Sequence, residues 1–168
     1  MYAVKIENLS SRPLNFFSGF VIYTYKTKNK NMQVFIVGTP FKTAQILDKR
    51  RLNKQIIECG QILDAIEGKT STWANHPCTI MYRNHVEWLS NYRACLLHYK
   101  EGHILTALEF NKLCNQYKPN FHNKSYFTNM KRRLYTKDHE HYKQWECHGE
   151  SYENWYWVDN QWKIYKQN

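Results

Sequence analysis

A stripe of polar side chains between residues 51 and 58 is the part of the sequence best suited to chemistry. Its members recur three and four residues apart, on one face of a predicted helix: Arg51, Lys54, Gln55 and Glu58. A carboxylate there can move protons, and an amine can attack carbon if its pKa is lowered. The same spacing is typical of a solvated helix face with a Lys54–Glu58 ion pair worth about 0.2–0.5 kcal/mol. Both interpretations stay open on the pattern alone.

Apolar periodicity predicts the helix that carries this stripe. The pattern is helical from Thr43 to Glu67, with a break near Asp48 to Arg50, and Gly68 is expected to end it. A second, apolar stripe on the same helix predicts its buried face and consists of Leu52, Ile56, Cys59, Leu63 and Ile66. The preceding run from Met32 to Val37 is typical of a short buried strand, ended by the residues Gly38-Thr39-Pro40.

The rest of the chain predicts further helices and a hairpin. Asn75 is expected to cap one helix that runs from Pro77 to about Glu101. Shorter helices follow over residues 104–117 and, rich in basic residues, over 125–135. Two aromatic runs then flank Asp159-Asn160, which suits a two-residue turn. The predicted fold class is mainly α: a helical domain with a short N-terminal strand and a C-terminal β-hairpin.

The 168 residues suit one domain, with residues 1–31 as an N-terminal extension and 32–168 as a single helical domain. The extension is interpreted either as a tail or as a sign that Met32 is the true start. A net charge of +10 combined with 16% aromatic residues favours nucleic acid as the partner, although an ordinary domain with a solvated basic face is the alternative. No apolar run is long enough to span a membrane, so no membrane partner is expected.

Five cysteines without a C-x-x-C pair indicate reduced thiols and a cytoplasmic protein. A group of metal-ligating residue types lies near the C-terminus, among charged residues, but its spacing matches no common zinc pattern: His139, His141, Cys147 and His148. The sequence therefore predicts no metal site.

Three motifs carry a family resemblance. They are L-D-x-x-R-L-x-K-Q-x-x-E-x-x-Q-I-L from Leu47 to Leu63, W-x-N-H-P from Trp73 to Pro77, and a late pattern from Lys137 to Tyr142. In combination they resemble a family of small bacterial and phage proteins grouped with the pyrimidine-dimer DNA glycosylases of the phage endonuclease V type. The resemblance begins at Met32 and covers most of residues 32–145.

This resemblance implies a DNA repair glycosylase, with abasic-site lyase activity, that acts on damaged or modified pyrimidines in duplex DNA. Glu58 would be the catalytic carboxylate, and Arg51 would hold DNA near it. The family's nucleophile is an α-amine exposed when the initiator Met is removed, whereas here Met32 is followed by Gln33, which is too large for ordinary Met removal. Three possibilities remain: the Met32 amine acts, Lys54 substitutes for it, or the lyase step is lost.

Further residues are predicted to contact nucleic acid. Gln55 lies on the same face as Glu58, and His76 can contact a phosphate or make a local hydrogen bond at a helix start. Lys131, Arg132 and Arg133 form either a phosphate-contact strip or a solvated face. Tyr142 and Trp145 are predicted to stack on bases. The C-terminal tryptophans at 155, 157 and 162 are expected to pack the hairpin instead.

The function predicted from the sequence needs no cofactor and is carried out by a monomer on double-stranded DNA. The alternative is a non-catalytic basic DNA-binding protein that retains the glycosylase scaffold. A nucleotide-processing enzyme is disfavoured because the sequence contains no glycine-rich phosphate loop and no carboxylate cluster for Mg²⁺.

Overall fold

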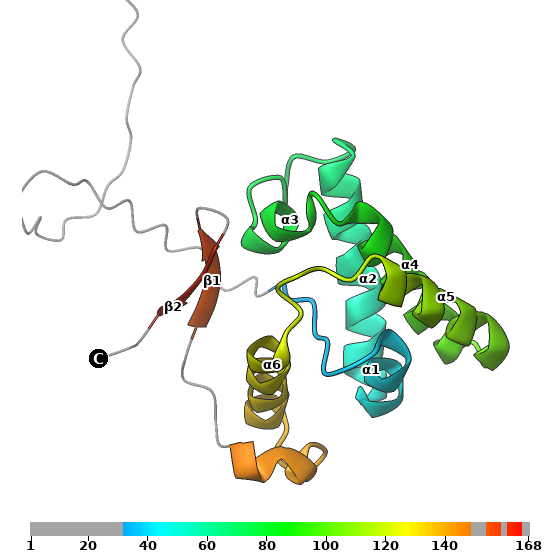
Figure 1. Cartoon of the computed structure of the whole chain (residues 1–168), viewed down its shortest axis with the longest axis vertical. Coiled ribbons are helices and arrows are strands. Elements are labelled where there is room, and N and C mark those ends of the chain that lie inside the picture. The colour runs from blue at the N-terminus through cyan, green and yellow to red at the C-terminus, as the bar shows by residue number, and fades with distance from the viewer. Residues whose placement is uncertain (1–31, 149–153, 159–160, 166–168) are drawn as a thin grey trace, which may run out of the picture. The chain divides into compact units, whose positions relative to one another are not determined.

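The computed structural model describes residues 32–148, 154–158 and 161–165, all within the unit Asn31–Asn168 (Figure 1). The predicted extension over residues 1–31 and the predicted turn at Asp159-Asn160 lie outside the described residues. The described part is mainly helical, which confirms the predicted class. Its elements before the C-terminal strands are α1 (Pro40–Ile46), α2 (Lys49–Ile66), α3 (Pro77–Tyr82), α4 (Val86–Lys100), α5 (Ile104–Gln116), α6 (Lys124–Lys137) and the 3-10 helix η1 (Lys143–His148).

The break between α1 and α2 lies where the sequence predicted it. Asp48 has an extended backbone, and its side chain accepts a hydrogen bond from the Arg51 N–H at 3.0 Å, which caps α2. The apolar stripe of α2 faces inward, with Leu52, Ile56 and Cys59 buried. At the other end Gly68 takes a φ of +76°, a left-handed conformation that ends the helix.

The single helix predicted from Pro77 to about Glu101 is wrong, because α3 ends at Tyr82 and α4 begins at Val86. His85 has a non-helical backbone, and its N–H closes a turn onto the Tyr82 carbonyl at 2.8 Å. The predicted cap is also wrong by one residue. His76 caps α3 through Nδ1, which accepts the Cys78 N–H at 3.2 Å. Histidine can take this role because its neutral ring offers one acceptor nitrogen.

The run from Met32 to Val37 is buried and lacks regular secondary structure, so the predicted N-terminal strand is wrong. Its backbone groups bond to side chains of the surrounding helices in place of a neighbouring strand. The Gln55 carbonyl oxygen accepts the Phe35 N–H at 2.8 Å, and the Tyr126 hydroxyl donates to the Val34 carbonyl at 2.8 Å. The Tyr92 hydroxyl donates to the Phe35 carbonyl. A buried backbone needs partners, and here helix side chains supply them.

The C-terminal segment forms two strands, β1 (Asn154–Val158) and β2 (Gln161–Tyr165). They pair antiparallel, with Trp157 opposite Trp162. The predicted packing of the three C-terminal tryptophans concerns side chains outside the described part of the structure.

Aromatic residues form much of the core. The Trp88 ring stacks between Tyr82 and Tyr92, with centroid distances of 5.6 and 5.0 Å. Figure 1 shows α4 and α5 side by side, and α2 packs against α4.

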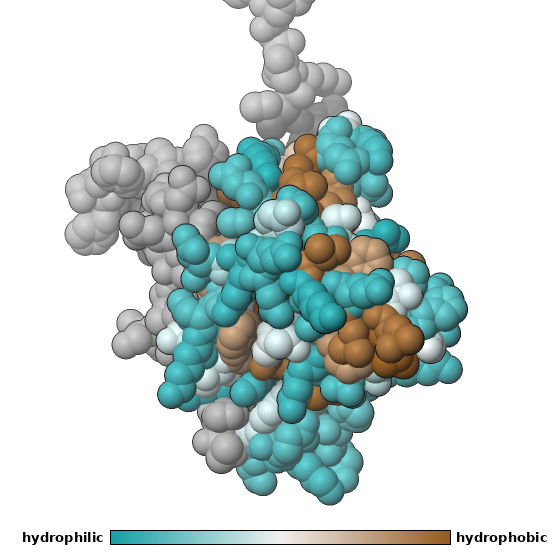
Figure 2. Space-filling model, turned by 45° about the vertical axis from the view of Figure 1, so that its right-hand side comes forward, coloured by the Kyte–Doolittle hydropathy of each residue, from teal (hydrophilic) through white to brown (hydrophobic). Residues whose placement is uncertain are grey.

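The face shown in Figure 2 is largely hydrophilic, with separate apolar patches. In the described residues, no helix combines the length and the apolar character needed to cross a membrane.

Candidate active site

Glu58 lies in α2 and is buried, with 7% of its surface exposed. Its two carboxylate oxygens have different partners. Lys54 Nζ lies 3.5 Å from Oε1, and Gln55 Nε2 donates to Oε2 at 3.2 Å. The structure thus brings two residues of the predicted polar stripe, Lys54 and Gln55, to the carboxylate of a third, Glu58.

Gln55 connects this carboxylate to the buried segment that precedes α1. Only 1% of its surface is exposed, and its amide group has three partners. The oxygen accepts the Phe35 N–H, while Nε2 donates to the Gln33 carbonyl and to Glu58. The structure therefore places Gln55 inside the protein, where it positions both the carboxylate and the backbone near Met32.

The surroundings of Glu58 favour its protonated form more than water does. Burial raises the pKa of the Glu58 carboxyl, although the Lys54 charge and a hydrogen bond from the Gln33 backbone act in the opposite direction. The Lys137 charge also opposes the rise in this pKa. A carboxyl with a raised pKa can carry a proton closer to neutral pH, which suits a general acid or base.

Lys137 is a residue near this site that sequence reasoning missed. It ends α6, and Nζ lies 5.9 Å from the centre of the Phe35 ring. The residue as a whole is exposed. Partial burial of its ammonium group nevertheless lowers the pKa of Lys137, and the charges of Lys54 and Arg51 lower it further. The signal lay in the late family pattern, which begins at this residue.

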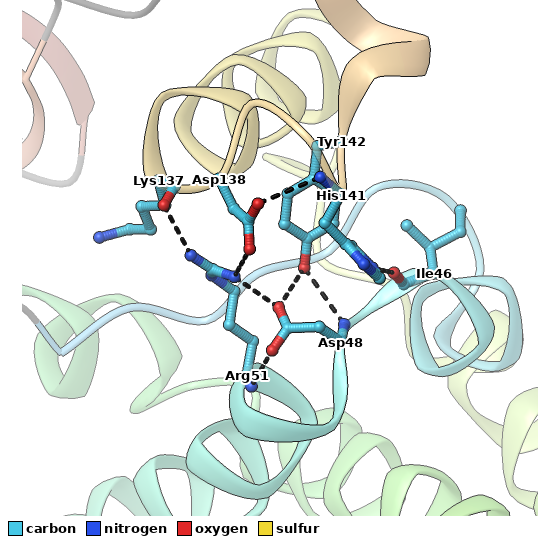
Figure 3. Close-up of polar contacts among 7 residues, drawn as sticks. All are labelled: Ile46, Asp48, Arg51, Lys137, Asp138, His141 and Tyr142. Carbon is cyan, nitrogen blue, oxygen red and sulfur yellow. Dashed lines mark hydrogen bonds and ion pairs between the residues drawn. The ribbon is translucent and has the colours of Figure 1, made fainter.

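Arg51 belongs to a second polar network, one turn before Lys54 (Figure 3). Its Nη1 contacts Asp48 Oδ2 at 2.6 Å and Asp138 Oδ2 at 3.2 Å. Its Nη2 donates to the Lys137 carbonyl at 3.0 Å. The Arg51 side chain is only 17% exposed. Its contacts with Asp48 and with the Lys137 carbonyl join the start of α2 to the end of α6.

Tyr142 completes this network, with the Arg51 guanidinium over the face of its ring. Its hydroxyl donates to Asp48 Oδ2 at 2.8 Å, and Arg51 Cζ lies 5.3 Å from its ring centre. The ring also stacks on Trp145 at 5.3 Å. Both aromatic residues are buried, at 0% and 7% exposure. The structure places these two predicted base-stacking residues within the core.

Asp48 responds to its surroundings in the opposite way to Glu58. Burial disfavours its ionised form, but hydrogen bonds from Arg51 and Tyr142 outweigh burial and lower the pKa of Asp48 to about 2. Asp48 therefore carries a fixed negative charge that pairs with Arg51.

The remaining predicted contacts lie apart from Glu58. The His76 ring caps α3 and meets Trp73 edge-on at 5.3 Å. Lys131, Arg132 and Arg133 lie on α6 and are partly exposed. Burial lowers the pKa of the Arg133 guanidinium. Arg133 is therefore the one of the three whose charged group is largely buried.

Comparison with known protein families gives a match over the part of the chain that contains Glu58 and its partners. Residues 32–100 match the model of one family, described as pyrimidine dimer DNA glycosylase. This confirms the family resemblance. The matched range begins at Met32 and contains Arg51, Lys54, Gln55 and Glu58, but it ends before the Lys137–Tyr142 pattern. No match was found among curated proteins or among solved structures.

Proposed function

We propose that this chain is a DNA repair glycosylase that removes damaged or modified pyrimidines from duplex DNA, with Glu58 as its catalytic carboxylate. The observation that carries the proposal is a buried carboxylate, held by Gln55 and paired with Lys54, inside the range that matches the pyrimidine dimer DNA glycosylase family. The net charge of +10 supports a polyanionic substrate.

The chemistry requires two functions at the sugar. When the bond between C1′ and the base breaks, positive charge develops on the sugar, and a nearby carboxylate stabilises it or moves a proton. An amine can take the place of the departing base at C1′; the C1′–O4′ bond then opens, with a proton passing from the nitrogen to O4′, and leaves a Schiff base. Loss of a C2′ proton from this Schiff base expels the 3′ phosphate and so cleaves the DNA strand. Glu58 supplies the carboxylate in this proposal.

Three amines are candidates for the nucleophile. A free amine at Met32 would be one residue along the chain from Gln33, whose backbone bonds to Glu58 and Gln55. Lys54 is within 3.5 Å of Glu58, but its side chain is 56% exposed and ion-paired. Lys137 adds a third candidate because the pKa of its amine is lowered by burial and by neighbouring positive charges. Loss of the lyase step is the remaining possibility.

The proposed DNA contacts divide into two groups. Lys131 and Arg132 are partly exposed and are proposed to contact phosphates. Arg51 and Tyr142 are proposed to act by fixing α6 and Lys137 against α2, since their polar groups already bond within the protein. Residues 32–168 are proposed to form the glycosylase-like domain, and residues 1–31 its N-terminal extension.

Glu58→Gln tests the central assignment on duplex DNA that carries a thymine dimer or an abasic site. We expect base release and strand cleavage to fall by roughly 10²–10⁴-fold, the usual contribution of a general acid or base. Glu109→Gln, on the exposed face of α5, is the matched control. DNA affinity, measured by fluorescence anisotropy, should stay unchanged in both variants. Equal turnover in the two variants would remove Glu58 from the mechanism.

Borohydride trapping identifies the amine. Reduction of the Schiff base on abasic DNA leaves a covalent adduct, and peptide mass spectrometry locates it at Met32, Lys54 or Lys137. Base release without an adduct would indicate a glycosylase that lacks the lyase step. Salt-sensitive DNA binding with neither adduct nor base release would support the non-catalytic DNA-binding alternative.

A further inference from the structure

The end of α4 carries a group of side chains that the proposed glycosylase function does not use. The helix ends in a Schellman motif, in which the His103 N–H bonds to the His98 carbonyl at 2.8 Å and the Gly102 N–H bonds to the Tyr99 carbonyl at 3.1 Å. Gly102 takes the left-handed φ of +82° that this motif requires. The motif brings its first and last residues together, and an apolar contact is common there. Here both positions are histidines.

Three ligand atoms converge at this turn. His98 Nδ1 lies 3.5 Å from His103 Nδ1, and His103 Nδ1 lies 3.6 Å from Glu101 Oε2. All three atoms lie within 4.8 Å of one another. Zn–N bonds of about 2.0–2.1 Å at tetrahedral angles separate two ligand atoms by about 3.3–3.4 Å. Both measured separations are within a few tenths of an ångström of that spacing.

The group is held in place and remains accessible. The His98 ring is half-buried and stacks on Phe110, with a centroid distance of 5.4 Å and an interplanar angle of 4°. The side chains of His103 and Glu101 are 61% and 46% exposed. An ion from solvent can therefore reach the group, and only the exposed side chains have to adjust.

The end of α2 shows what the same backbone motif does with other side chains. There the Lys69 N–H bonds to the Asp64 carbonyl at 2.9 Å, and Gly68 takes a φ of +76°. The Lys69 ammonium lies 3.9 Å from Asp64 Oδ1 and also pairs with Glu67. At α2 one of the three positions is itself a cation, Lys69, which pairs with the carboxylates at the other two. At α4 the corresponding residues are His98, Glu101 and His103, which offer two imidazole rings and a carboxylate.

We propose that His98, Glu101 and His103 bind one zinc ion. Imidazole nitrogen and carboxylate oxygen are ligands that zinc commonly takes, and either ring nitrogen of histidine can serve. Three protein ligands leave the fourth tetrahedral position to water. Bound there, the ion links the last turn of α4 to the residue that precedes α5. The site is independent of the proposed glycosylase activity.

Zinc titration of the full chain without a histidine tag tests this proposal. Isothermal titration calorimetry should show one ion bound, and Co²⁺ in place of zinc should give the visible absorption of tetrahedral coordination. His103→Ala and Glu101→Ala should each weaken zinc binding by more than roughly tenfold, a loss that even supporting residues of metal sites produce. Both side chains are exposed, so these variants are expected to fold.

Two control variants locate the site. Lys69→Ala changes the corresponding position of the α2 motif, and His139→Ala removes a histidine of the C-terminal cluster. Both should bind zinc as the unaltered chain does. The proposal is overturned if the unaltered chain takes up no zinc, or if His103→Ala and Glu101→Ala bind zinc as tightly as the unaltered chain does; loss of binding in His139→Ala would place the ion at the C-terminal cluster instead.

Discussion

Asp48 and Glu58 lie on or beside the same helix, each paired with a basic residue of that helix, and their environments push their pKa values in opposite directions. The pKa of Asp48 is lowered to about 2, whereas burial raises the pKa of Glu58. The difference reflects how deeply each carboxylate is buried and how strong its donors are. Asp48 accepts hydrogen bonds from the Arg51 backbone, the Arg51 guanidinium and the Tyr142 hydroxyl.

Glu58 is more deeply placed and has weaker partners. Lys54 lies at 3.5 Å and keeps more than half of its side chain in water, and Gln55 is a neutral donor at 3.2 Å. Where the environments of two carboxylates push their pKa values apart, the one with the raised pKa is the better proton carrier. We infer that Asp48 maintains the fold, and Glu58 is the group available for chemistry.

The largest expected effect on stability comes from removing the cation that pairs with Asp48. Arg51→Met removes the guanidinium that pairs with the Asp48 and Asp138 carboxylates and donates to the Lys137 carbonyl. We expect the free energy of unfolding to fall by about 2–3 kcal/mol, somewhat less than for a fully buried ion pair. Lys54→Met is the matched control, and its loss should stay below about 1 kcal/mol because its ion pair is largely exposed. Urea unfolding measures both, and equal losses would contradict the division between the two carboxylates.

The pH dependence of stability gives a smaller effect. The pKa of Asp48 is about 2 in the folded chain and 3.8 as its ordinary value. The unfolded chain therefore takes up this proton first as the pH falls. The resulting stabilisation is complete above the ordinary pKa and is lost between about pH 4 and pH 2. We expect it to amount to roughly 1–2 kcal/mol, because Asp48 retains some contact with solvent.

Asp48→Asn isolates this contribution, since asparagine can still cap α2. The variant should be less stable than the unaltered chain near neutral pH, and the two should converge as the pH approaches about 2. Urea unfolding at a series of pH values measures the difference. A difference that stays constant with pH would show that the Asp48 charge does not matter.

The smallest expected change is in the stability of Glu58→Gln. Burial works against the ionised form of Glu58, as the raised pKa of its carboxyl indicates. A neutral amide removes that penalty, so the free energy of unfolding at neutral pH should be unchanged or higher by up to about 1 kcal/mol. Thermal or urea unfolding provides the test. A loss as large as that of Arg51→Met would make Glu58 a structural residue like Asp48.

Local pattern predicted α2 and its buried apolar face well, but it did not predict that Gln55 and Glu58 on the polar face are buried too. Spacing placed Gln55 and Glu58 on one face and indicated a solvated surface as the simplest interpretation. In the structure the segment from Met32 covers that face, through contacts such as Phe35 with Gln55, which are 20 residues apart. No local periodicity reports a contact of this range. The motif match was the signal that distinguished Glu58 from an ordinary surface carboxylate.

Other differences between sequence pattern and structure also arise from contacts that local spacing does not report. The run from Met32 to Val37 has the composition of a strand, but tyrosine and glutamine side chains take the place of a neighbouring strand. Tyr142 and Trp145 follow a basic helix and resemble a stacking surface, yet they stack on each other inside the protein. The histidines at the end of α4 meet because Gly102 reverses the chain, which spacing along a helix does not indicate.

The buried segment from Met32 to Val37 also bears on the order of folding. Its hydrogen bonds to α2, α4 and α6 join residues 20, 57 and 92 positions apart. Contacts of such range form late, because the intervening chain must first lose its freedom. The helices can therefore form early from local contacts, but the carboxylate at position 58 acquires its enclosed surroundings only when this segment docks. Assembly of the candidate active site and completion of the fold are then the same event.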